Sequence, residues 1–146
     1  MSNQKFQLWR RICGAILLSS LLAVPGFTAE EAPMTVQQLM QSVITPATST
    51  LWGAYDIKTD AQWQELEAAA QEVIRAGELL KTGGSNPQDI ASAANQDWQE
   101  FTRQMIDAGR SALTAIGKHD EEALSVAGND ELYPPCESCH GKYMNH

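Results

Sequence analysis

The sequence predicts an all-α fold, and more specifically an antiparallel four-helix bundle. Residues 30–146 are rich in Ala, Gln, Glu and Leu and contain few runs of β-branched residues. Apolar residues recur at alternating spacings of three and four, which is the period of one buried helix face. The stretches that separate these patterns are short, and short links favour antiparallel neighbours.

The first helix is predicted from Val36 to about Tyr55, where apolar residues keep a helical period. Thr35 and Gln38 have the spacing of a capping box, in which the two side chains bond each other's backbone N–H groups. Pro46 lies inside this helix and should kink it, because its ring removes a backbone hydrogen bond.

A second helix should begin at Thr59 or Asp60 and end at about Leu80. Gly83 and Gly84 follow it, and glycine readily takes the left-handed conformation that ends helices. The buried stripe of this helix consists of Trp63, Leu66, Ala70, Val73, Gly77 and Leu80.

A third helix is predicted to start at Pro87, after Asn86, and to run to about Gly117. A short turn over residues 117–119 should lead to a fourth helix near Asp120, whose acidic first turn suits the positive end of a helix dipole. Asn129-Asp130 and Pro134-Pro135 interrupt this helix. Because two prolines in a row cannot both continue a helix, we expect a break near residue 133 and a restart at residue 135.

Residues 1–29 are predicted to be a secretory signal peptide. Three basic residues precede an apolar segment over residues 12–24, which is too short to span a bilayer comfortably. Pro25-Gly26 breaks that segment, and residues 27–29 offer a cleavage point before Glu30. An uncleaved membrane anchor is the competing interpretation. Cys13 lies in the apolar segment and would be removed with the leader.

Residues 30–146 then form one domain of 117 residues. It contains seven Lys and Arg residues and 18 Asp and Glu residues, which gives a formal net charge of −11. This charge argues against nucleic acid and anionic membrane surfaces as partners, and no stable membrane span is expected once the leader is cleaved. A partner with a basic docking surface is compatible with it, although acidity is also common in secreted proteins.

The most informative motif is Cys136-Glu137-Ser138-Cys139-His140, which only six residues follow. C-x-x-C-H is the attachment signature of c-type haem. Two thiols on one helical turn add to the two vinyl groups of one haem, and the adjacent His can ligate the iron from the proximal side. The sequence therefore predicts one covalent haem c on Cys136 and Cys139, with His140 as the proximal iron ligand. Export supports this prediction, because bacteria attach haem c outside the cytoplasm.

A zinc site or a redox dithiol would use the same cysteines. Zinc prefers four nitrogen or sulfur ligands, and beyond the motif only His146 is nearby. A redox C-x-x-C normally starts a helix within a βαβ unit, and no strand pattern is present.

Attachment of haem at the C-terminal end of a small exported helical domain resembles the class II cytochromes c, the cytochrome c′ and cytochrome c-556 group. The resemblance covers roughly residues 35–144. It is carried by the haem motif followed by Tyr143, and by the Leu39-Met40 pair on the first helix.

The resemblance implies two alternatives for the sixth iron ligand. In the c-556 type a Met on the first helix binds the iron, and Met40 falls about where that ligand would lie. In the c′ type the iron is five-coordinate and binds NO or CO. Met40 could also be a plain core residue. The weaker candidates for the distal ligand are Met34, Met105, His119 and His146.

This chain departs from the family at several positions. Many c′ members have an Arg where Met144 and Val36 stand here, which weakens the carry-over of gas chemistry and of the usual propionate contact. Lys142 either supplies the positive charge of the missing Arg or is simply solvated. Trp52, Trp63 and Trp98 are expected mostly in the core, although one of them could pack against haem.

The function expected from these observations is electron transfer in the periplasm, with His140 proximal and Met40 distal. We expect no enzyme, because no distal acid–base pair of the kind a peroxidase needs can be assigned. The alternatives are a five-coordinate gas-binding protein and a haem subunit of a larger oxidoreductase. The resemblance also implies a candidate homodimer through the first two helices.

Overall fold

The computed structural model describes residues 33–144; the predicted leader and His146 lie outside these residues. All regular structure in this range is helical, so the predicted all-α class is confirmed. The elements are α1 (Val36–Leu39), the π-helical η1 (Met40–Ile44), α2 (Thr45–Trp52), α3 (Asp60–Leu80), α4 (Pro87–Ala93), α5 (Gln96–Ile116), α6 (Glu121–Val126), the π-helical η2 (Ala127–Leu132) and α7 (Tyr133–Tyr143).

The first helical segment joins α1, η1 and α2 without a gap. It begins as predicted, since the Gln38 N–H donates to Thr35 Oγ1 at 3.1 Å and the Thr35 N–H donates to Gln38 Oε1 at 2.9 Å. Just before Pro46 the backbone widens into a π-helix, in which the Thr45 N–H donates to the Met40 carbonyl five residues back. Pro46 therefore lies in the first turn of α2, where it lacks a donor without ending the helix. The segment stops at Trp52, earlier than predicted.

The α3 helix begins and ends as the sequence predicts. Thr59 and Gln62 form a second capping box at its start. Gly83 and Gly84 follow its end with φ angles of 76° and 64°, the left-handed conformation that favours glycine. A side chain at Gly84 would meet the Met34 carbonyl at 2.6 Å, so this turn also packs against the start of the first segment.

The prediction of one uninterrupted third helix is wrong, because the chain breaks between α4 and α5. Asn95 is extended there (φ −75°, ψ 140°) and is the N-cap of α5. Asn favours that position over the helix interior. The Gln99 side-chain amide donates to the Ala93 carbonyl at 2.6 Å and to the Lys81 carbonyl at 2.9 Å. It thereby satisfies a helix-end carbonyl that the break leaves without an intrahelical partner.

The predicted break near residue 133 is also wrong. α6, η2 and α7 form one continuous helical segment that starts after the N-cap Asp120. The Tyr133 N–H donates to the Gly128 carbonyl in the π pattern, and Pro134-Pro135 fall in the first turn of α7. Two missing donors are tolerated there because the preceding turn is already rearranged.

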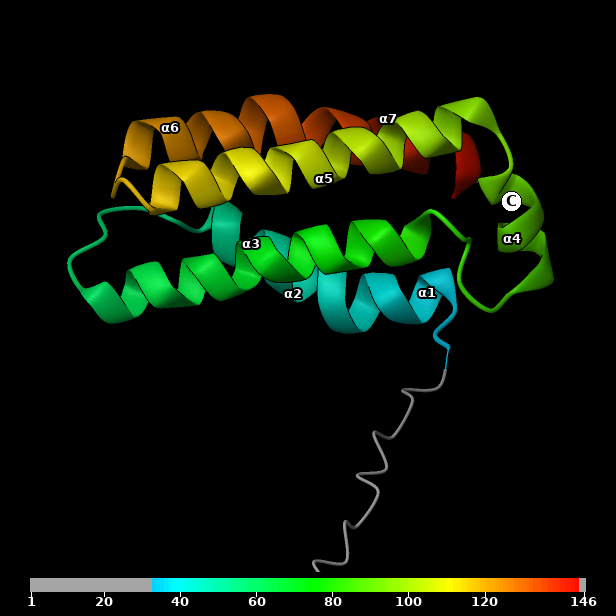
Figure 1. Ribbon diagram of the computed structural model, residues 1–146, viewed down its shortest axis with the longest axis horizontal. Coiled ribbons are helices and arrows are strands. Elements are labelled where there is room, and N and C mark those ends of the chain that lie inside the picture. Colours follow the sequence, from blue (N-terminus) through cyan, green and yellow to red (C-terminus); the bar gives the residue numbers. More distant parts are fainter. Residues whose placement is uncertain (1–32, 145–146) are drawn as a thin grey trace, which may run out of the picture. The chain divides into compact units, whose positions relative to one another are not determined.

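Within residues 33–144 the segments form two layers (Figure 1). α5 lies beside α6, η2 and α7 in one layer, and α3 lies beside α1 and α2 in the other, with consecutive long segments running in opposite directions. The α3–α5 contact is the most extensive between any two elements. Close approach is possible because Gly77 and Gly109 face the partner helix; a Cβ on either would lie 2.5 Å and 2.7 Å from isoleucine side chains.

The core lies between the two layers. Trp63 and Trp98 are buried, as predicted, whereas Trp52 is 42% exposed. Other buried apolar residues include Leu39, Leu66, Val73, Leu80, Met105, Ile106, Leu124 and Leu132. No helix among residues 33–144 combines the length and the apolar character that crossing a membrane requires.

Candidate functional site

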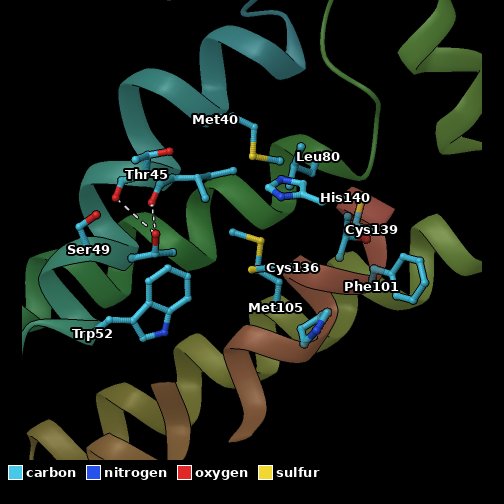
Figure 2. A pocket seen from close by; sticks show the side chains of 14 residues that line it. Met40, Thr45, Ser49, Trp52, Leu80, Phe101, Met105, Cys136, Cys139 and His140 are labelled. Carbon is cyan, nitrogen blue, oxygen red and sulfur yellow. Dashed lines mark hydrogen bonds between the residues drawn. The ribbon is translucent and has the colours of Figure 1, made fainter. Parts of the chain in front are cut away.

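A cavity opens between the first helical segment, α5 and α7 (Figure 2). Its empty space is about 730 Å³, counting the solvent at its mouth. The lining is mainly apolar, with sulfur atoms and hydroxyl groups among the carbons. It consists of Met40, Ile44, Thr45, Thr48, Ser49, Trp52, Leu80, Phe101, Thr102, Met105, Pro135, Cys136, Cys139 and His140.

The residues that the sequence predicts for the site come together around this cavity. Met40 is the first residue of η1, whereas Cys136, Cys139 and His140 lie on α7, about 100 residues later. Figure 2 shows Met40 from the first segment and His140 from the last on the same side of this space. Met105 from α5 joins them, so two thioethers, two thiols and an imidazole share one cavity.

Two further candidate ligands, Met34 and His119, do not line this cavity. Met34 precedes α1, and its sulfur accepts from Ser42 Oγ at 3.8 Å rather than lining the cavity. His119 is exposed in the turn before α6, as predicted, with a φ of 52°. Its ring also stacks on Trp63 at a centroid distance of 4.7 Å, a contact that the sequence did not suggest.

Both cysteines are thiols in the structure and both are half-buried. Burial raises the pKa of Cys136 to about 11. The pKa of Cys139 is also about 11, mainly through burial and then through the neighbouring Cys136. At neutral pH both sulfurs therefore carry their protons, unlike the low-pKa thiolates of redox and nucleophilic cysteines.

We predict that these thiols react slowly in haem-free folded protein. A pKa two units above the ordinary value of 9.0 lowers the thiolate fraction about 100-fold, and the greater nucleophilicity of the more basic thiolate recovers about tenfold. Alkylation by iodoacetamide at pH 8 should be about tenfold slower than in the same protein unfolded in urea. The rate in folded protein should rise until about pH 11. Equal rates in the two states, with helicity confirmed by circular dichroism, would contradict the burial of the thiols.

Asp97, at the start of α5, anchors the end of α7. Its carboxylate accepts from Tyr143 Oη at 2.6 Å and from the Trp98 N–H at 3.0 Å, and it pairs with Lys142 Nζ. The Tyr143 ring packs edge-on against Trp98 at 4.9 Å. Lys142 is therefore engaged with Asp97 rather than simply solvated. These contacts fix the turn of helix that immediately follows His140.

Trp52 anchors the start of α7 from the first segment. Its indole N–H donates to the Gly128 carbonyl at 2.9 Å, and its ring meets Tyr133 edge-on at 6.2 Å. The absence of a side chain at Gly128 leaves room for this contact, because a Cβ there would lie 3.3 Å from the Trp52 ring. The haem-motif helix is thus held at both ends by side chains from other elements.

Sequence reasoning missed both anchors. Asp97 lies 46 residues from Tyr143, and Trp52 lies 76 residues from Gly128. A pairing over such a separation leaves no local pattern. The only sequence signals available were an acidic residue at a helix start and a glycine inside a helical stretch, both of which are common.

No Lys or Arg among residues 33–144 lines this cavity or the two hollows that adjoin it at His140. Basic side chains form exposed ion pairs elsewhere, such as Arg75–Glu72 on α3 and Arg103–Glu100 on α5. In the same range, no three His, Cys, Asp or Glu side chains are grouped so that they could hold a metal ion. Comparison with family models, curated proteins and solved structures found no match.

Proposed function

We propose that this chain is an exported, periplasmic monohaem c-type cytochrome that transfers electrons, similar to the class II cytochromes c. In this proposal its four helical segments form an antiparallel four-helix bundle around covalently attached haem. One observation carries the proposal: Met40 lines the same cavity as the C-x-x-C-H residues, although about 100 residues separate them.

The residues around the cavity fit a haem. Cys136 and Cys139 would form the two thioether bonds, each S–H adding across one vinyl C=C bond. His140 and Met40 would be the iron ligands. The lining is mostly apolar, which suits the macrocycle. When bound, haem supplies an iron that alternates between the ferric and ferrous states.

The protein itself would position the residues that hold the haem and shield the cavity from water. Asp97 and Trp52 hold the two ends of α7, which fixes the direction in which the motif side chains extend. The π-helical turn of η1 sets the register of Met40 relative to Pro46. Leu80, Phe101 and Met105 exclude water from the cavity wall, and a thioether ligand in such surroundings favours ferrous iron and raises the reduction potential.

A five-coordinate, gas-binding haem is the second candidate. It is supported by the hydroxyl groups of Thr45 and Ser49, which line the cavity on the same segment as Met40. A hydroxyl donor in an apolar cavity can stabilise a small polar ligand on the iron. Oxidised and reduced visible spectra separate the two candidates.

We predict that the purified holoprotein is low-spin, with the weak long-wavelength band of a Met–ferric haem. Met40→Leu should remove that band and produce a high-spin spectrum that responds to CO. Met105→Leu is the matched control, because it changes a second cavity methionine at similar volume and should leave the band in place. A high-spin wild-type spectrum that Met40→Leu does not alter would favour the gas-binding candidate. A protein without haem absorbance after expression with a haem-attachment system would refute both.

A further inference from the structure

A shallow hollow lies on the outside of α7, beside the cavity. It is lined by Trp52, Tyr133, Cys136, Glu137, His140, Gly141 and Met144. Three of these side chains are large, apolar and open to solvent: Trp52 is 42% exposed, Tyr133 50% and Met144 67%. Isolated exposed apolar residues are common, but a group of them around one hollow marks an interaction surface. We call this surface the His140 face.

The two aromatic rings of the His140 face are held in fixed positions. Trp52 donates to the Gly128 carbonyl at 2.9 Å, and Tyr133 packs edge-on against Trp52 at 6.2 Å. Ordered aromatic side chains lose little conformational entropy when a partner binds, and Trp and Tyr are enriched among the residues that dominate binding energy. The rings are therefore suited to the centre of a protein interface.

The lining of this face includes one acidic residue and no Lys or Arg, and residues 30–146 as a whole contain 18 Asp and Glu residues against seven Lys and Arg residues. Lys142 is paired with Asp97. Glu137 lies on the face itself and is exposed, and no basic side chain among residues 33–144 shares the hollow with it. A partner that covers this face must therefore supply the positive charge.

We propose that the His140 face docks a basic redox protein, whose lysine or arginine side chains surround an apolar centre that covers Trp52 and Tyr133. The inference rests on the proposed function and specifies where its partner binds. Opposite charges raise the association rate and orient the partner, while the aromatic contact slows dissociation. This surface is the one nearest to His140, the proposed iron ligand.

The test is calorimetric binding of the oxidised holoprotein to a lysine-rich mitochondrial-type cytochrome c, used as the basic redox probe. Glu137→Lys should weaken binding at least about fivefold at low salt, and the difference should shrink near 0.2 M salt, where screening is strong. Glu65→Lys makes the same charge change at an exposed α3 position outside the hollow and should alter binding less than about twofold. Tyr133→Ala should weaken binding at both salt concentrations, whereas Tyr55→Ala, at an 87% exposed tyrosine outside the hollow, should not.

The outcomes distinguish the two proposals. A visible spectrum without haem overturns the proposed function, and this inference with it. A haem-containing protein that does not bind the probe at low salt overturns the inference alone. Equal effects of Glu137→Lys and Glu65→Lys would mean that only overall charge matters, and this result also overturns the assignment of the face.

Discussion

Replacement of Cys136 and Cys139 by alanine together should abolish covalent haem attachment. In the proposed function each thiol would supply one thioether bond, and burial keeps both sulfurs protonated at neutral pH in the cavity that they line. Haem staining after denaturing electrophoresis should disappear, and the mass of the purified chain should fall by one haem. Either single replacement should leave one thioether bond at most and a lower yield of holoprotein.

Cys13→Ser is the matched control for this experiment. Cys13 lies in the predicted leader, so its replacement should leave the haem content of the exported chain unchanged. Retention of covalent haem in the double alanine variant would contradict the assignment of the motif. Loss of haem in Cys13→Ser as well would indicate that the leader cysteine takes part, contrary to our expectation.

Replacement of Trp98 by alanine should lower the free energy of unfolding of the holoprotein by about 3–5 kcal/mol. Trp98 is only 3% exposed, and its indole N–H donates to the Leu80 carbonyl at 2.7 Å. It also packs against Tyr143, so its loss should loosen the end of α7 in addition to opening a void in the core. Urea unfolding followed by far-ultraviolet circular dichroism measures this effect.

Two variants define the origin of that loss. Trp98→Phe keeps an aromatic ring but removes the indole donor, and the Leu80 carbonyl retains the Gly83 N–H at 3.0 Å, so it should cost about 0.5–1.5 kcal/mol. Trp52→Ala should cost less than Trp98→Ala, because Trp52 is 42% exposed and less apolar area is lost. If Trp98→Ala lowered stability by less than about 1 kcal/mol, Trp98 would not be the core residue that its burial indicates.

Local patterns predicted the helices well where the signal lies within a few residues. The Thr35–Gln38 capping box, the helix start after Thr59 and the glycines after Leu80 behave as expected. The errors arose where proline and asparagine were judged by residue type alone. Pro134-Pro135 do not break the last segment, since a π-helical turn precedes them, and Asn95 caps a new helix where periodicity alone would have continued the preceding one.

The sequence predicted several residues that line the candidate cavity, but not the residues that hold α7 in place beside it. The motif spacing identified Cys136, Cys139 and His140, and the family resemblance suggested Met40, which lines their cavity. Asp97 could not be identified, because its partners lie about 45 residues away and any exposed acidic residue at a helix start looks the same in the sequence. Tertiary packing alone brings it to Tyr143.

The π-helical turns also affect how this chain should be aligned with others. A π-turn contains one residue more than the α-turn it replaces, so η1 places an additional residue between Met40 and the helix that follows, while the flanking faces keep their directions. A relative with an unbroken α-helix here would be one residue shorter, and its counterpart of Met40 would stand one position closer to the equivalent of Pro46. An alignment without a gap would then pair that counterpart with Gln41 instead of Met40.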